Sequence, residues 1–402
     1  MRHTSESGAM DGRTREYLRG RFGDHYRRTV VAPPPAGNER EWGYITWSGG
    51  GTTMVRHRSM IDLIGGGSLS GFLAEERPRH VYFSAGRYDD PGADGMGAKG
   101  WRGSDLIFDL DGDHLPGVDP ETTGYGEMLA ECKEALTRLL DLLEADLGFD
   151  EQTVVFSGSR GYHVHVRVEG VQALDRSARG EIADYLLGED LEFDDVVRTE
   201  TVAGSAGRSS PADKRTLPDG GWAGRTRDRL EGFVDELLEL PDEQAVERLQ
   251  SYEGIGEGKA SAALRAAREN REALADGNVD LHSAVYTVAR RLFEEVLAAE
   301  AAPIDEPVTT DVNRLIRLPG SLHGGSGLAV RRIDRADVPS FDPLVDAVPE
   351  TFVGNRIAVS VEEATVVELG GETFRLEPGV HTVPEYVGVF AMARGHAAKS
   401  PE

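Results

Sequence analysis

The chain has 402 residues, of which 70 are Asp or Glu and 44 are Lys or Arg, so its formal net charge is −26. At roughly 150 residues per domain this length allows two or three domains, and it is far more than a single buried core requires. The one cysteine, Cys132, excludes an internal disulfide framework. The sequence contains neither a signal peptide nor the ~18 consecutive apolar residues that cross a membrane. We expect a cytoplasmic protein with no membrane partner.

The basic residues are almost all arginine, because lysine occurs only five times. Many carboxylates and few lysines indicate a surface that stays hydrated in concentrated salt, although an ordinary acidic protein is the simpler alternative. At about 1 M salt the Debye length falls to about 3 Å, so a negative net charge would hardly repel a polyanion beyond contact range. The charge therefore does not exclude DNA as a partner.

The first 170 residues predict a β-rich region. A basic segment over 17–28 precedes three prolines at 33–35, which end any helix. An amphipathic helix is predicted over 128–147. Short strands separated by glycine-rich turns are predicted at residues 42–47, 53–59, 80–85, 105–111, 153–157 and 162–168.

The sequence changes character after Gly170, where helices dominate. Helices are predicted at residues 179–187, 226–240, 242–251, 259–275 and 281–301. A segment rich in Gly, Ser and Pro, 203–224, indicates a loop. Strand-like sequence resumes at Pro303 and includes a short strand at 308–312. We therefore expect a β-rich core in two pieces, 1–170 and 303–402, separated by a helical insertion over 171–302.

Two aspartates end the apolar strand predicted at 105–111. Side chains alternate along a strand, so Asp109 and Asp111 point to the same side, roughly 6.5–7 Å apart along the backbone. Paired carboxylates suit Mg²⁺ or Mn²⁺, and two such ions stabilise the attacking and leaving oxygens of a phosphoryl or nucleotidyl transfer. A solvated acidic strand end is the simpler alternative.

A second group of polar residues occupies S-G-S-R-G-Y-H over 157–163. A turn of small residues exposes backbone amides to an anion, while Ser157 offers a hydroxyl and Arg160 a forked cation for phosphate. His163 then begins the next strand. A plain hairpin turn would need the glycines but neither the arginine nor the histidine.

A third group lies in R-L-I-R-L-P-G-S-L-H-G-G-S-G over 314–327. Arg317 precedes a Pro-Gly turn, and His323 lies beside glycines that let a triphosphate approach the backbone. Asp305 and Asp311 lie just upstream. The alternative for this segment is an ordinary connection between strands.

The segment G-I-G-E-G-K-A over 254–260 lacks the spacing of a phosphate-binding loop. It is similar to the turn of a helix-hairpin-helix, whose amides hold a DNA phosphate, but a helix start capped by glycine explains it more simply.

Two other functions remain open at this point. The strand followed by D-x-D-G resembles the nucleophile motif of haloacid-dehalogenase-like phosphatases, in which Asp109 would form a covalent aspartyl phosphate. That enzyme also needs a phosphate-binding lysine and a later acidic motif, G-D-x-x-x-D, which this sequence lacks. A non-catalytic DNA-binding accessory subunit is the other alternative, and the retained carboxylates, arginine and histidines argue against it.

Taken together and in this order, the three groups resemble the catalytic small subunit of archaeal and eukaryotic DNA primases. The composition points to a member from a halophilic archaeon. The resemblance spans most of the chain and rests on residues 40–44, 80–92, 99–115, 156–166, 306–324 and 383–387.

The resemblance implies an α+β fold, with a mixed β-sheet catalytic core of the archaeo-eukaryotic primase type and an inserted helical subdomain. It implies synthesis of primers de novo on single-stranded DNA from nucleoside triphosphates, and a heterodimer with a primase large subunit. Asp109, Asp111 and a third carboxylate would hold Mg²⁺ or Mn²⁺. The residues implied to contact the triphosphate, the last two of them nearby, are Ser157, Arg160, His163, Arg317, His323, Glu41 and Arg56.

The family pattern places the third aspartate 18 residues before the histidine of the third group, which selects Asp305 over Asp311. Two departures from the family are visible. Many relatives have lysine where this chain has Gly325, and many have a zinc knuckle between the first two groups. Here that region offers only His114 and Cys132, so we expect no structural zinc.

Overall fold

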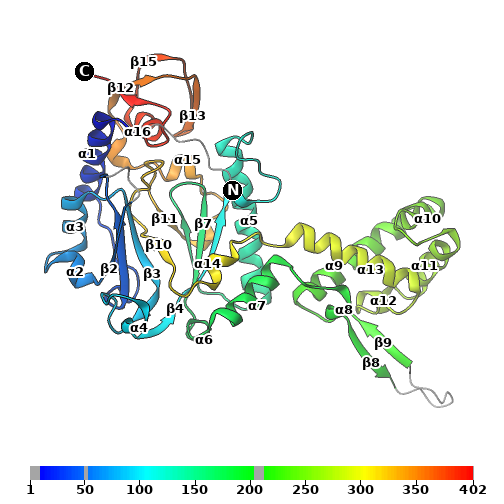
Figure 1. Cartoon of the computed structure of the whole chain (residues 1–402). Coiled ribbons are helices and arrows are strands. Elements are labelled where there is room, and N and C mark those ends of the chain that lie inside the picture. The colour runs from blue at the N-terminus through cyan, green and yellow to red at the C-terminus, as the bar shows by residue number, and fades with distance from the viewer. Residues whose placement is uncertain (1–9, 49–52, 203–211, 402) are drawn as a thin grey trace. The chain divides into compact units, whose positions relative to one another are not determined.

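The structure is a computed structural model that describes residues 10–48, 53–202 and 212–401 (Figure 1). The chain divides into two compact units, which we call the core unit and the helical unit. The core unit comprises Met1–Leu136, Glu151–Ala183 and Pro303–Glu402, and the helical unit comprises Thr137–Asp150 and Asp184–Ala302. No helix in the described part of the chain is both long enough and apolar enough to span a bilayer.

The core unit is built on antiparallel sheets. Its strands are β1 (Arg40–Ile45), β2 (Met54–Arg58), β3 (His80–Tyr88), β4 (Trp101–Ser104), β5 (Leu106–Asp111), β6 (Gln152–Phe156), β7 (Gly161–Val166), β10 (Leu315–Arg317), β11 (Arg331–Ile333), β12 (Arg356–Val361), β13 (Thr365–Leu369), β14 (Glu372–Leu376), β15 (Gly379–Pro384) and β16 (Ala398–Lys399). The first sheet has the order β10-β3-β1-β2, with β4 also paired to β3, and the second has the order β11-β6-β7-β5. Smaller sheets join β15-β12-β16 and β13-β14.

The helices that begin in the core unit are α1 (Gly12–Arg28), α2 (Met60–Ile64), α3 (Leu69–Glu76), α4 (Met96–Lys99), α5 (Tyr125–Asp141), α6 (Glu169–Gln172), α7 (Arg176–Leu187), α14 (Glu306–Thr310), α15 (Pro343–Asp346) and α16 (Glu385–Ala393). Helices α1 to α3 lie along the outer side of β2 and β3 (Figure 1). Helix α5 packs on β5, where the thiol of Cys132 lies 3.5 Å from the carbonyl of Leu110. An apolar helix face thus covers the strand that carries Asp109 and Asp111.

The helical unit contains α8 (Phe193–Val196), β8 (Arg198–Val202), β9 (Ala212–Thr216), α9 (Gly221–Glu239), α10 (Asp242–Gln250), α11 (Glu257–Glu269), α12 (Arg271–Ala275) and α13 (Ser283–Glu300). Helix α11 begins after Gly256 in the N-cap position, as predicted for the glycine-rich segment. The two long helices of the helical unit, α9 and α13, each bury one face. These faces include Leu230, Phe233, Leu292 and Phe293.

The α+β fold class is confirmed, and most predicted elements are present. Two local predictions are wrong. Residues 308–312 do not form a strand, because Pro307 and the acidic Glu306 in the first turn favour the start of α14. The segment 203–224 is not wholly a loop: 203–211 lie outside the described residues, but β9 pairs with β8 along its length, and α9 begins at Gly221.

A buried ion-pair network joins the two large sheets where β4 leads into β5. Asp105 is fully buried and accepts two hydrogen bonds from Arg40, at 3.0 and 2.9 Å, and one from Arg167 at 2.9 Å. Arg40 also donates to the carbonyls of Ser84 and Ala85 on β3, both at 2.8 Å. Since Arg40 belongs to the first sheet and Arg167 follows β7 in the second, Asp105 fixes the start of β5 against both.

Replacing Arg40 with Met should lower the free energy of unfolding by about 3–5 kcal/mol, because Asp105 would keep a buried charge with half of its partners removed. Denaturant unfolding in high salt measures this change. The matched control is Arg102→Met, since Arg102 is half exposed and pairs with Glu39 at 3.1 Å; its loss should cost less than about 1 kcal/mol. Equal effects of the two substitutions would contradict the assigned importance of the network.

Candidate active site

Three aspartates converge at the end of β5. Asp109 and Asp111 extend from the same side of the strand, and the backbone amide of Asp305, at the start of α14, donates to the carbonyl of Asp109 at 2.9 Å. Burial, followed by the charges of Asp111 and Asp305, raises the pKa of Asp109 to about 7. The carboxylates of Asp111 and Asp305 are therefore close enough to Asp109 to disfavour its negative charge, and a cation bound there would relieve that repulsion.

The donor set fits a hard divalent cation, because Mg²⁺ and Mn²⁺ prefer carboxylate oxygens. Within 10–48, 53–202 and 212–401, however, no group of three or more His, Cys, Asp or Glu side chains is already arranged around an ion position. Asp111 explains part of this, since its carboxylate accepts from the amide of Asp113 at 3.3 Å and from Arg160 at 3.1 Å.

The turn between β6 and β7 lies beside these aspartates. Arg160 pairs with Asp111 and Asp113, and the hydroxyl of Ser157 accepts from the amide of Gly161 at 3.3 Å. Position 161 requires glycine, because a Cβ atom there would lie 1.7 Å from the carbonyl oxygen of Leu110. That close approach brings the turn directly against the aspartate strand.

His163 lies opposite Asp109 in the antiparallel pair of β5 and β7. Its Nε2 atom is 3.3 Å from a carboxylate oxygen of Asp109. Burial and the nearby cations Arg317 and Arg314 lower the pKa of His163 to about 3, so the ring is neutral at physiological pH. The imidazole can therefore orient Asp109 without neutralising its charge.

The third sequence group forms a tight turn that touches the second. The Nδ1 atom of His323 accepts from the amide of Gly325 at 3.2 Å, and the hydroxyl of Ser326 donates to the carbonyl of Gly158. Gly158 has a positive φ of 83°, and a Cβ atom there would lie 2.8 Å from that of His323. Glycine at 158 is thus needed both for the backbone and for this contact.

Arg317 links the two halves of the site. It ends β10, opposite Tyr82 on β3, and its guanidinium lies 5.7 Å from the centre of the Tyr82 ring. Its charge acts on the pKa values of Asp109 and His163 on one side and of His323 on the other. The Arg317 cation therefore lies between the carboxylates and the glycine-rich turn.

A family model described as DNA primase small subunit matches residues 108–335. Proteins named DNA primase small subunit PriS are similar over nearly the whole chain. That of Natronomonas pharaonis is 70% identical over 98% of this chain and all of its own. That of Haloarcula marismortui is 62% identical over the same shares. That of Methanothrix thermoacetophila is 40% identical over 96% and 99%.

The chain belongs to the DNA primase small subunit family. The sequence-based prediction of a template-directed nucleotidyltransferase of the primase type is confirmed. The relatives from Natronomonas pharaonis and Haloarcula marismortui come from halophilic archaea. The phosphatase and the non-catalytic accessory subunit are not supported.

Two of the primase residues selected from the sequence form a separate cluster on the first sheet. Glu41 on β1 is fully buried and accepts from Arg56 at 3.2 Å, from the amide of His57 at 3.2 Å and from Lys99 at 2.7 Å. His57 has a positive φ of 57°, a strained conformation for this residue. Among the described residues, neither Glu41 nor Arg56 bonds to the aspartates or to Ser157, His163, Arg317 or His323.

Three further residues, to which no individual role was assigned from the sequence, lie in these clusters. Lys99 is completely buried against Glu41, and His80 and Arg79 lie beside the turn of His323. The rarity of lysine could have singled out Lys99, because it is one of only five lysines in the chain. His80 begins a segment, 80–92, that carries the family resemblance, but the proximity of His80 and Arg79 to residue 323 was not predictable, since it depends on the pairing of β3 with β10.

The raised pKa of Asp109 predicts a pH-dependent stability. Its pKa of about 7 in the folded chain lies above the ordinary value near 4, so the folded state retains a proton that the unfolded state releases. The contribution of Asp109 to the free energy of unfolding is fully present below pH about 4 and is lost as the pH rises through about 7. The Asp109→Asn variant, which cannot ionise, should therefore gain about 2 kcal/mol relative to the unmodified chain between pH 5 and pH 8 without divalent ions.

Thermal unfolding of both proteins at several pH values, in constant high salt, measures this difference. Adding Mg²⁺ at pH 8 should raise the melting temperature of the unmodified chain more than that of Asp109→Asn. A stability difference that does not change with pH would contradict the repulsion between the three carboxylates.

Proposed function

We propose that Asp109, Asp111 and Asp305 hold the divalent Mg²⁺ or Mn²⁺ ions with which this chain joins nucleotides into primers on single-stranded DNA. The observation that carries the proposal is the convergence of Asp111 and Asp305 on Asp109 at the end of β5. When bound, such ions supply positive charge to the attacking and leaving oxygens of the nucleotidyl transfer. Asp305 is preferred to Asp311, whose carboxylate accepts from the amide of Asn313 at 2.9 Å and acts on Tyr88 instead of Asp109.

The incoming nucleoside triphosphate would lie between the aspartates and the turns that carry Ser157 and His323. Arg317 is suited to the phosphates, because its Nε atom is buried without a hydrogen-bond partner among the described residues. His163 would hold the carboxylate of Asp109 in place. These groups are preorganised donors and charges around the position where phosphate charge develops.

Arg160 has a double role in this proposal. In the structure it neutralises Asp111 and Asp113, both of which face the site. Binding of a divalent ion to Asp111 would release the guanidinium, which is 47% exposed and free to turn toward the triphosphate. Metal and nucleotide binding would then support each other.

Glu41 and Arg56, which lie on the first sheet, would contribute contacts at the primer or nucleotide side of the site. We further propose that the helical unit is the inserted subdomain of the primase fold and that the chain acts as a heterodimer with a primase large subunit. The family membership supports both statements. We expect no structural zinc.

The proposed activity is tested by incubating the purified chain in high salt with single-stranded DNA, labelled nucleotides and Mg²⁺ or Mn²⁺. The reaction is run with and without a candidate large subunit. Metal-dependent appearance of short labelled products is the expected result. Absence of products under all conditions, from a folded protein with its large subunit, would contradict the proposal.

Comparison of Asp305→Asn with Asp311→Asn tests the third carboxylate. Asp305→Asn should lower nucleotide incorporation by about 100-fold or more, because it removes a metal ligand. Asp311→Asn should retain most activity, since its amide oxygen still accepts from Asn313. Both rates are measured at saturating Mn²⁺, and loss of activity in Asp311→Asn alone would show that the wrong aspartate was selected.

Replacing Arg160 with Ala should raise the KM for nucleotides about tenfold, because a charge-assisted contact with phosphate is lost. The affinity for single-stranded DNA in a gel-shift assay should stay unchanged. Reduced DNA affinity with normal nucleotide kinetics would instead assign Arg160 to the template.

A further inference from the structure

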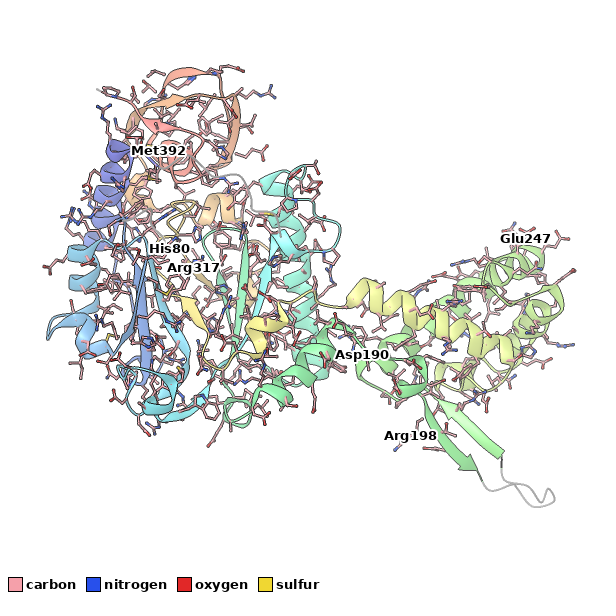
Figure 2. All side chains as sticks on the ribbon, viewed as in Figure 1. His80, Asp190, Arg198, Glu247, Arg317 and Met392 are labelled. Carbon is pink, nitrogen blue, oxygen red and sulfur yellow. The ribbon has the colours of Figure 1, made fainter. Side chains whose placement is uncertain are left out.

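His80 is the first residue of β3 and lies at the same end of the first sheet as Arg317 (Figure 2). Its ring meets that of His323 edge to face, with ring centres 4.8 Å apart. The amide of Gly324 donates to the Nδ1 atom of His80 at 3.4 Å. His80 is therefore in direct contact with the turn that carries His323.

The two imidazoles are held in the same tautomer. The Nδ1 atom of His80 accepts from Gly324, and that of His323 accepts from Gly325. Each neutral ring therefore carries its proton on Nε2. Among the described residues neither Nε2 atom has a hydrogen-bond partner, and neither is one of the buried polar atoms that lack one, so both reach solvent.

Positive charge surrounds this pair of donors. Arg79 and Arg317 act on both rings, and Arg160 acts in addition on His323. Burial, followed by these charges, lowers the pKa of His80 to about 3, so the ring stays neutral. The largest contributions to both shifts come from burial and from cationic or imidazole groups, not from carboxylates. Two neighbouring N–H donors in a positive environment are suited to the oxygens of one phosphate chain.

We propose that His80 is a further substrate-binding residue, whose Nε2–H donates to the triphosphate of the incoming nucleotide beside His323. This inference rests on the proposed function, because it assigns a ligand to the same nucleotide site. The contact is made before and during the reaction alike, so its loss raises KM and leaves kcat nearly unchanged.

Two conservative variants separate this role from a purely structural one. Glutamine can place an N–H donor near the position of Nε2, whereas asparagine can only reproduce the acceptor at Nδ1 that holds Gly324. His80→Gln should keep the KM for nucleotides within about threefold, and His80→Asn and His80→Ala should raise it about tenfold. In all three variants kcat should remain within about threefold of the unmodified chain.

Inorganic tripolyphosphate provides a second readout, since it presents the phosphate chain without a base or sugar. Its inhibition constant should rise about tenfold in His80→Asn and stay near the unmodified value in His80→Gln. The matched control is His25→Gln, because His25 is also buried and contacts the same segment at the carbonyl of Gly320, at 3.2 Å. That control should change neither KM nor the inhibition constant.

The outcomes separate the inference from the proposed function. If His80→Asn restores normal KM and inhibition while His80→Gln does not, His80 only holds the Gly324 turn and the inference is wrong. If all His80 variants behave like the unmodified chain, it is wrong as well. If the unmodified chain neither incorporates nucleotides nor binds tripolyphosphate, the proposed function fails first and the inference fails with it.

Discussion

The buried carboxylate of Asp105 fixes the start of β5, the strand that carries Asp109 and Asp111. A fully buried charge is stable only if it is paired and hydrogen-bonded, and Asp105 meets this requirement with Arg40 from one large sheet and Arg167 from the other. Arg179 adds donors to the carbonyls of Ser104 and Asp105. Four and six residues later the same strand presents Asp109 and Asp111. Their position relative to Arg317 therefore depends on a network that excludes water and salt, and that is screened far less than an exposed ion pair.

Neutral imidazoles lie among the charged groups of the site, in which Arg160 pairs directly with Asp111 and Asp113. Carboxylates lie at the end of β5 and the start of α14, whereas arginines come from β10 and the β6–β7 turn. The buried histidines at 80, 163 and 323 all have lowered pKa values, because burial and neighbouring arginines oppose a further positive charge. Uncharged imidazoles supply hydrogen-bond donors without repelling those arginines. The same arrangement leaves the negative charge around Asp109 for a cation to neutralise.

The sequence predicted those parts of the site that depend on local geometry. The two-residue period of a strand places Asp109 and Asp111 on one side, and the small residues around Arg160 predict a turn. Partners across strands were not predictable, because a pattern defines which face a residue occupies but not what lies opposite. The pairing of Arg160 with Asp111, the contact of His80 with His323 and the β8–β9 hairpin all belong to this second kind. The strand predicted at residues 308–312 was wrong for another reason, since the strand preference of the β-branched residues was outweighed by a helix-starting proline.

The scarcity of lysine is a property of the exposed surface, and it bears on how phosphate is bound. Of the five lysines, Lys99 and Lys399 are buried, and Lys133 and Lys214 are half-buried, which leaves Lys259 as the exposed one. Lys99 is retained where a compact ammonium fits against buried Glu41. An acidic surface in concentrated salt offers neither long-range attraction nor long-range repulsion to a polyanion. Under the proposed function, nucleotide binding relies on short-range donors held at fixed positions, which would be the buried imidazole rings and the guanidinium groups of the site.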